Sequence, residues 1–407
     1  MTINKWRLAL ASAGLISFGT AVQAEEQHQV MTALSQTTIS GYVETSAIWS
    51  PGGPNGTLAG RTFDGTADKL DGFNLHAVKL VLEKPLDDGQ WSAGYKADLV
   101  FGPDANYYSS LQNGAGVNTD DFAVKQAYVA LRAPVGNGLD IKLGVWDTIV
   151  GYEVFESGNN PNFSRSYGYS LEPTHHTGLL LSYNVADWLT ASAGIANGYT
   201  GPVNDRIHGP ASDNGEDRKA VLGSLTITLP ESAGVFAGTA IYAGIVSGEN
   251  TGTLGGVASL DTTLYYFGTT ISTGLEGLSL GGALDYRDDG NIGLLSSHAW
   301  TAALYGSFKA TEKLKLNARV EYAEGTLGTW YGAGAVAPGA VGVPNDNSLG
   351  AVTLTADYSL WANVVTRGEV RWDRNLGGDD IYHNTGGTQN DADADAVTLT
   401  ANIIYKF

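Results

Sequence analysis

The sequence predicts an all-β fold, a transmembrane antiparallel up-and-down β-barrel of about 16 strands. Three observations lead to this prediction: segments of strand length alternate in polarity, their apolar rows often begin or end in an aromatic residue, and the connections alternate between short and long. The segment 90–101 is an example, since Trp91 and Phe101 lie in its apolar row while Lys96 and Asp98 lie in its polar row. A barrel with lipid outside and water inside accounts for both rows.

The alternating segments have the length that a tilted strand needs to cross a bilayer, about 10 to 13 residues. Short connections such as 85–89 and 310–312 alternate with long ones such as 102–120 and 151–173. Short periplasmic turns and long extracellular loops are the arrangement of outer-membrane barrels. The expected strands are 38–50, 72–84, 90–101, 121–132, 139–150, 174–184, 188–198, 218–229, 234–247, 261–273, 276–288, 298–309, 313–324, 348–358, 361–374 and 395–407.

The last segment, 395–407, is an alternating strand at the very end of the sequence. Left unpaired, it would be an exposed edge prone to association. A closed barrel removes that edge by pairing the segment with 38–50. Phe407, with Tyr405 two residues before it, also resembles the carboxy-terminal signal by which the barrel assembly machinery recognises outer-membrane barrels. A soluble β-sandwich remains the alternative, because its half-buried strands alternate in the same way.

Residues 1–24 have the pattern of a cleaved secretory signal peptide. Lys5 and Arg7 precede an apolar stretch, and Ala24 occupies the small-residue position before the cleavage site. The protein is therefore expected to be exported, with 25–37 as a short periplasmic segment ahead of the barrel.

The barrel itself is expected to occupy 38–407. Beyond the signal, no run approaches the about 18 to 20 apolar residues of a membrane helix, which excludes a helical membrane protein. The sequence has 0 Cys, which excludes a disulfide framework and thiolate metal or redox sites.

The chain is acidic, with 42 Asp and Glu against 23 Lys and Arg and a net charge of −19. Acidic runs such as 391–395 fall in predicted loops, where they would enrich cations at a pore mouth, keep the rim soluble or contact lipopolysaccharide through divalent ions. They lack the spacing of a calcium loop, and no cofactor is expected. The absence of a basic stripe excludes nucleic-acid binding. The residues predicted to line a pore are Lys96, Asp98, Arg132, Lys142, Arg319, Glu321, Arg367, Glu369 and Arg371.

The stretch 143–183 carries a more specific pattern. A Gly-Tyr-Glu follows a strand, then comes an Asn-Pro-x-x-Ser-x-Ser segment, and Pro-x-x-His-x-Gly opens the next strand. The matching positions are Gly151, Tyr152, Glu153, Asn160, Pro161, Ser164, Ser166, Pro173, His176 and Gly178. This pattern resembles the putative beta-barrel porin-2 family, also called OmpL-like porins. The resemblance implies a gram-negative outer-membrane porin rather than an enzyme, and beyond about Tyr199 it extends only to the strand pattern.

The third long loop, 151–173, is rich in Tyr and Phe and poor in the acid that marks the other loops. Exposed loop tips favour small polar residues, so this loop is expected to fold into the lumen. Glu153, Glu156 and Arg165 would then face Arg319, Arg367 and Arg371 and set a transverse field across the narrowest section. The alternative is a loop over the rim or against a neighbouring subunit.

The function expected from these features is passive diffusion of small hydrophilic solutes and ions through a water-filled pore in the outer membrane. A homotrimer is possible. The alternative is a non-conducting structural or receptor barrel whose lumen is filled by its own loops. A hydrolase using Ser164 or Ser166 with a neighbouring histidine lacks the G-x-S-x-G elbow of such enzymes.

Overall fold

The computed structural model describes the barrel strands and part of the loops. The described residues are 30–31, 37–51, 58–66, 68–108, 121–204, 206, 218–250, 260–292, 295–326, 329–330, 346–377, 381–382 and 393–407. The predicted signal peptide and most of the segment 25–37 lie outside these residues, as do residues 391 and 392 of the acidic run 391–395. No helix within them is long and apolar enough to cross a bilayer.

Sixteen long strands form the wall, and they match the predicted segments closely. They are β2 (Thr38–Trp49), β3 (Gly72–Lys84), β4 (Ser92–Phe101), β5 (Phe122–Ala133), β6 (Leu139–Asp147), β7 (His175–Ala186), β8 (Leu189–Ala196), β9 (Ala220–Thr228), β10 (Ala240–Asn250), β11 (Leu260–Ser272), β12 (Leu278–Ile292), β13 (Leu295–Lys309), β14 (Leu314–Thr326), β15 (Asp346–Trp361), β16 (Val364–Asn375) and β17 (Asp395–Lys406). A two-residue strand, β1 (Val30–Met31), pairs with the start of β2.

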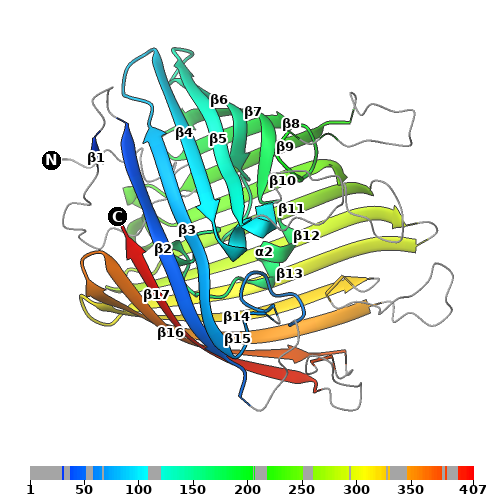
Figure 1. Ribbon diagram of the computed structural model, residues 1–407. Helices are drawn as coiled ribbons and strands as arrows, with labels where there is room; N and C mark the ends of the chain where they lie inside the picture. The colour runs from blue at the N-terminus through cyan, green and yellow to red at the C-terminus, as the bar shows by residue number, and fades with distance from the viewer. Residues whose placement is uncertain are drawn as a thin grey trace.

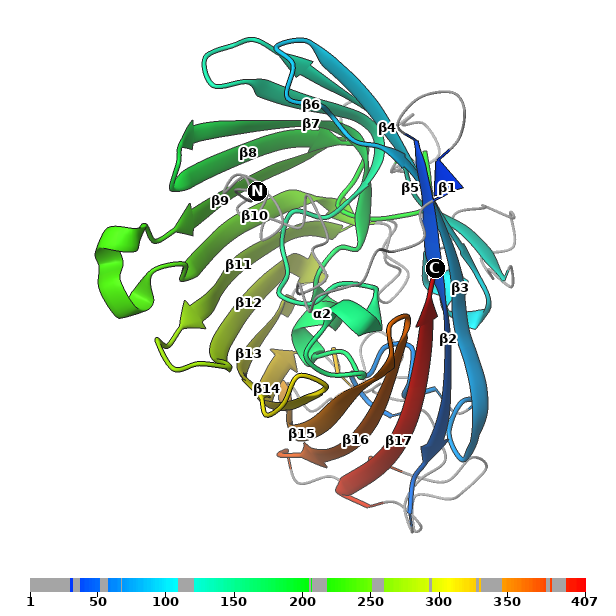
Figure 2. The ribbon, with the colours of Figure 1, turned by 90° about the vertical axis from the view of Figure 1, so that its left-hand side faces the viewer.

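The strands close into a ring in which each pairs antiparallel with its neighbours in the chain (Figures 1 and 2). The predicted pairing of the last strand with the first is confirmed: β17 pairs with β2, with Tyr405 opposite Val43 and Ala401 opposite Ala47. Phe407 continues this pairing, since its backbone exchanges two hydrogen bonds of 2.9 and 3.0 Å with Gly41. The terminal edge is thereby removed, and the all-β barrel predicted from the sequence is confirmed.

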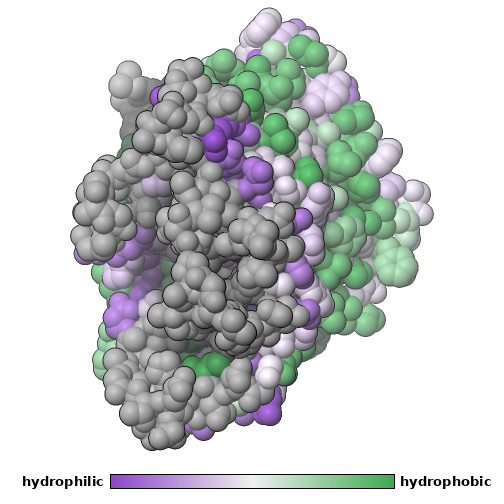
Figure 3. Space-filling model, turned by 90° about the vertical axis from the view of Figure 1, so that its right-hand side faces the viewer, coloured by the Kyte–Doolittle hydropathy of each residue, from purple (hydrophilic) through white to green (hydrophobic). Residues whose placement is uncertain are grey.

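The two rows of each strand face opposite sides of the wall, as the alternation predicts. In β14, Leu316 and Val320 are exposed, while Arg319 and Glu321 are buried. Figure 3 shows hydrophobic side chains gathered over the outer flank of the barrel. Such a surface suits lipid contact, because an apolar band is stable only where water is absent.

One predicted strand starts too early in the sequence. The prediction placed a strand at 234–247, whereas the short helix η3 (Glu231–Phe236) occupies its first residues and β10 begins at Ala240. Gly234 has a φ of 63°, a left-handed conformation that interrupts an extended chain. The apolar pair Val235 and Phe236 therefore lies in the turn between β9 and β10, where both residues are exposed.

Two bulges interrupt the alternation near the loop-bearing end of the barrel. The register between β2 and β3 shifts at Glu44 and Thr45, which leaves His76 as the extra residue. The register between β4 and β5 shifts at Asp98 and Leu99, which leaves Lys125 unmatched. Both extra residues are buried. A bulge changes which face of the sheet the side chains beside it point to, and bulges of this kind are common next to functional sites.

Candidate functional site

The third loop, residues 148–174, connects β6 to β7 and lies within the ring of strands (Figure 2). It contains the single turn η2 (Ser157–Asn159) and the short helix α2 (Tyr167–Leu171). The side chain of Ser166 caps α2 by accepting a hydrogen bond of 3.3 Å from the Tyr169 backbone N–H. Gly168 lets α2 approach the wall, because a Cβ there would lie 2.6 Å from an Asp285 carboxylate oxygen.

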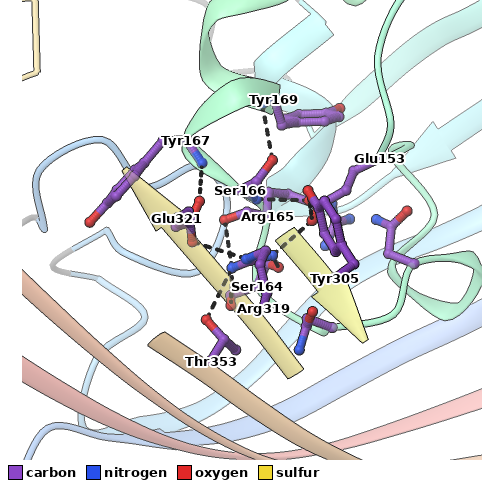
Figure 4. Close-up of polar contacts among 12 residues, drawn as sticks. Glu153, Ser164, Arg165, Ser166, Tyr167, Tyr169, Tyr305, Arg319, Glu321 and Thr353 are labelled. Atoms are coloured by element: carbon purple, nitrogen blue, oxygen red, sulfur yellow. Dashed lines mark hydrogen bonds and ion pairs between the residues drawn. The ribbon is translucent and has the colours of Figure 1, made fainter. Parts of the chain in front are cut away.

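Arg319 of β14 forms the centre of the contact between the loop and the wall (Figure 4). Its guanidinium lies 2.8 Å from the Glu153 carboxylate of the loop and 2.9 Å from the Glu321 carboxylate of its own strand. It also donates to the Ser164 and Arg165 carbonyl oxygens at 2.7 and 3.2 Å. The side chains of Arg319 and Glu153 are fully buried, so this ion pair is shielded from solvent screening.

Four wall residues around Arg319 also hold the loop backbone. Arg371 donates to the Arg165 carbonyl at 2.6 Å, and Arg367 donates to the Ser157 and Asn160 carbonyls at 2.5 and 3.0 Å. Glu369 accepts hydrogen bonds from the Phe163 and Ser164 backbone N–H groups at 2.6 and 3.0 Å. Glu321 accepts one of 2.7 Å from Tyr167 N–H. Charge-assisted bonds of this kind satisfy the backbone of a loop that has no sheet partner.

Glu156 contacts lysines rather than the arginines that the sequence suggested. Its carboxylate pairs with Lys79 of β3 and lies 3.4 Å from Lys125 of β5. Burial opposes the charged form of Glu156, but Lys125 and Lys79 outweigh this effect and hold the pKa of its carboxyl below the usual range. Asp98 completes the cluster at 2.8 Å from Lys79.

Arg165 also differs from the predicted arrangement, because its guanidinium turns back into its own loop. It donates to the carbonyl oxygens of Val154 at 3.1 Å and Phe163 at 2.6 Å, and to that of Phe155. It lies 5.2 Å from the Phe63 ring centroid. Arg165 therefore folds the loop on itself and is buried, rather than presenting its charge to open space.

The remaining predicted lining residues lie apart from the loop. Arg132 forms a bidentate pair with Asp140 at 2.6 and 2.7 Å, near the turn between β5 and β6. Lys142 lies 4.7 Å from the Tyr128 ring centroid, and Lys96 lies 4.0 Å from Glu83. These residues belong to the inward rows of β4 to β6, but none has a contact with the third loop among the interactions of the described residues.

The first long loop supports the third. Arg61 pairs with Asp373 of β16 at 3.0 Å and also contacts Asp64. Thr62 and Gly60 both hydrogen-bond the Ser170 hydroxyl of α2, at 2.8 and 2.9 Å. Residues 58–66 thus link α2 to β16.

Two cavities lie beside the third loop. The narrower, of about 60 Å³, is lined by loop residues that include Val150 and Glu153, by Lys125 of β5 and Asp147 of β6, and by Ser224, Thr226, Tyr242 and Tyr266 of β9 to β11. The wider, of about 320 Å³, is lined by Tyr107, Tyr108, Ser170, Leu171, Glu172, Thr174, His175, Tyr199, Thr200, Gly201, Pro202, Asn250 and Arg287. Both share Tyr108, Glu172 and Thr174, so they meet along one face of the loop.

Glu172 is the acid common to both cavities. Burial, together with the nearby carboxylates of Asp285 and Glu153, raises the pKa of the Glu172 carboxyl well above its usual value. Gly151 makes room for it: its φ of 111° suits glycine, and a Cβ there would lie 2.2 Å from a Glu172 oxygen.

Comparison with known proteins now identifies the chain. The family model described as "Putative beta-barrel porin-2, OmpL-like" matches residues 36–407. The chain belongs to this porin family. The porin is an outer-membrane channel for passive diffusion. No curated protein matches it.

Several solved structures share the fold of the porin. OmpT, an outer-membrane protein of Vibrio cholerae, is 14% identical with a TM-score of 0.54, over 94% of this chain and 100% of its own. The outer-membrane channel DcaP of Acinetobacter baumannii is 12% identical with a TM-score of 0.57, over 93% and 99%. OprB of Pseudomonas putida is 11% identical with a TM-score of 0.55, over 91% and 94%. At these identities the likeness concerns the fold alone.

Sequence reasoning missed several residues that hold the third loop of the porin. Lys79 and Lys125 were absent from the predicted lining because bulges beside them shift the alternation. A charge within an otherwise apolar row was the available signal, since Lys79 lies between Ala77 and Val81 in its own row. Arg61 had no such signal, because nothing in its loop sequence indicates a contact with β16.

Proposed function

We propose that solutes cross the porin between the third loop and the inward rows of β7 to β11, and that the charged wall opposite serves to hold the loop. The contact of Arg319 with Glu153 carries this proposal, because a fully buried ion pair has no surface left for a passing solute. The two cavities beside the loop supply the route. Its narrow section is the narrower cavity, which Val150, Tyr242 and Tyr266 help to line.

This assignment gives Glu153, Glu156, Arg319, Arg367, Glu369 and Arg371 an indirect role in permeation. Their charges position the loop, and the position of the loop sets the width of the passage. A transverse field from unpaired opposing charges is not needed, since the acids and bases of this set contact one another or the loop backbone. Selectivity among ions then depends mainly on the acidic residues of the loops at the pore mouth. Their attraction for cations weakens as the salt concentration rises.

The chain acts as a channel rather than as an enzyme. The family and the fold support this view. The outward apolar band fits lipid, and Phe407 beside Gly41 fits recognition of the last strand by the assembly machinery. We expect residues 1–24 to be removed on export. A homotrimer is also proposed, since one of the OmpT structures is described as a trimer form.

Conductance of the purified porin in planar bilayers tests the proposal. We expect discrete current steps and a cation preference that falls as salt is raised, because screening suppresses the field of the rim. The Arg165→Glu variant removes the hydrogen bonds by which this side chain folds the loop, so we expect it to raise the conductance by loosening the loop. A change in ion selectivity at unchanged conductance would instead favour a transverse field. Absence of current steps from folded protein would favour the non-conducting barrel.

A further inference from the structure

The wider cavity lies at the loop-bearing end of the barrel, where β7, β10 and β12 meet the third loop. His175 opens β7, Asn250 ends β10, and Arg287 lies near the end of β12. At about 320 Å³ the cavity falls at the small end of the range found for ligand pockets. A solute entering from outside the cell would reach it before the narrow section.

Aromatic rings supply much of the apolar lining. Tyr108 and Tyr199 are buried, whereas Tyr107 keeps 38% of its surface exposed. The Tyr107 ring lies 4.8 Å from Phe63 and 6.1 Å from Tyr108, measured between ring centroids. The neighbouring rings therefore fix the position of the Tyr107 ring, while part of the Tyr107 side chain stays exposed to solvent. Such rings offer flat apolar surfaces against which the C–H face of a ligand ring can pack.

Neutral polar groups lie among these rings. Thr174, Thr200 and Asn250 line the cavity, and the Thr174 hydroxyl lies 3.1 Å from His175 Nδ1. The His175 side chain is buried, and within the described residues its Nε2 atom has no hydrogen-bond partner. Leaving a buried polar atom unpaired is costly, so a ligand hydroxyl that reached this nitrogen would recover a hydrogen bond.

The charged groups of the cavity are already engaged. Arg287 donates to the Asp289 carboxylate at 3.1 Å and pairs with it at 3.0 Å. Glu172 lies beside the Asp285 carboxyl group, and its raised pKa favours the neutral form. Among the described residues that line the cavity, a charged ligand would find no free counterion, and a buried charge without a partner is expensive.

We propose that this cavity binds a neutral polyhydroxylated ring of monosaccharide size on its way to the narrow section. Rings and hydroxyls of the protein match the two surfaces of such a ligand, its C–H face and its hydroxyl edge. The role of this binding in transport rests on the proposed passage. The binding itself does not depend on that passage.

Binding and conductance should be measured separately on purified full-length porin. We expect calorimetric titration with glucose to be saturable, and glucose on the loop side of a planar bilayer to reduce the single-channel current over the same concentrations. Glucuronate, which keeps the ring and adds a charge, and sorbitol, which lacks the ring, should both bind more weakly. Removing the exposed ring in Tyr107→Ala should weaken glucose binding about threefold to tenfold. Tyr107→Phe, which keeps the ring, should bind as the unaltered porin does.

Tyr265→Ala is the matched control, because Tyr265 is a similarly exposed tyrosine on the outward row of β11, remote from the cavity. It should leave glucose binding unchanged. Absence of saturable glucose binding to a porin with normal current steps would overturn this inference and leave the proposed function intact. Tighter binding of glucuronate than of glucose would also overturn it. Saturable glucose binding without any current would instead support the site and contradict the proposed passage.

Discussion

Arg319 Nη1 lies 2.8 Å from Glu153 Oε1, joining the wall at β14 to a loop residue 166 positions earlier in the chain. Both side chains are fully buried. Removing one partner of a buried ion pair costs about 3 to 5 kcal/mol, since it leaves the other charge uncompensated. We therefore expect Arg319→Met to release the third loop from the wall, raise the single-channel conductance and lower the midpoint of thermal unfolding.

The control for this variant is Arg374→Met. Arg374 pairs with Asp395 at 3.0 Å on the same side of the barrel, but about half of each side chain is exposed. Exposed pairs contribute about 0 to 1 kcal/mol, so this variant should keep the original conductance and midpoint. Equal effects of the two substitutions would show that Arg319 does not hold the loop.

We expect the contact between the third loop and the wall to be most stable at an intermediate pH, because the pKa values of two loop carboxyls, Glu156 and Glu172, are shifted in opposite directions. The lowered pKa of Glu156 means that its stabilising contribution is present above the ordinary carboxyl pKa and is lost as pH falls through the lowered value. The raised pKa of Glu172 acts in the opposite sense: its contribution is complete below the ordinary value and is lost as pH rises through the raised one.

We accordingly expect the conductance to be lowest between these limits and to rise toward either extreme as the loop loosens. Glu172→Gln removes one of the two titrations, so it should suppress the rise on the alkaline side only. Conductance measured against pH for both proteins tests this expectation. An alkaline rise that survives in Glu172→Gln would assign it to another group.

Substitution of an outward residue tests the barrel register. Leu354, in the middle of β15, is 56% exposed on the outward row. Arginine near the bilayer midplane costs about 2 to 4 kcal/mol, so Leu354→Arg should destabilise the porin by that amount in lipid-vesicle unfolding. Leu275→Arg is the matched control, because Leu275 is exposed in the turn between β11 and β12, where an arginine reaches water. Similar costs at the two positions would contradict the register.

The end of the chain contributes to closure and, as we propose, to recognition. Phe407 exchanges two backbone hydrogen bonds with Gly41, and a Cβ at Gly41 would lie 2.7 Å from the Phe407 ring. Deleting Phe407 should therefore reduce the amount of heat-modifiable barrel in outer-membrane fractions and leave degraded protein in the periplasm. Tyr405→Phe, which preserves an aromatic residue on the same row, is expected to assemble normally. Unchanged outer-membrane levels after the deletion would remove the basis for an assembly signal.

The sequence predicts the barrel well because one physical rule applies to every strand. Lipid on one side and a polar interior on the other impose a period of two, and Val370 between Glu369 and Arg371 obeys it as clearly as Leu316 does. The short turns then determine the strand order, because each short turn joins two strands that are neighbours in the sheet. The prediction failed at 234–239, where Val235 and Phe236 suggested a strand although Gly234 bends the backbone into a turn.

The site was less accessible to sequence reasoning, because its contacts join segments far apart in the chain. The composition of the third loop suggested that it turns inward, yet the partners of its charges depend on the depth and rotation of the loop. Glu156 contacts Lys79 and Lys125, which bulges bring to the inward side, and Arg165 satisfies its own loop. Neither outcome is encoded in local periodicity.

In the proposed route, solutes pass along β7 to β11 and not along the charged wall. Because the sequence has 0 Cys, single cysteines can report on each side of the loop. Ser224 lines the narrower cavity from β9, whereas Thr400 is buried on the inward row of β17, opposite Glu369. The decisive measurement is single-channel current during treatment with a charged, thiol-specific methanethiosulfonate reagent. We predict a stepwise fall in current for Ser224→Cys and no change for Thr400→Cys, whereas a fall for Thr400→Cys alone would contradict the account.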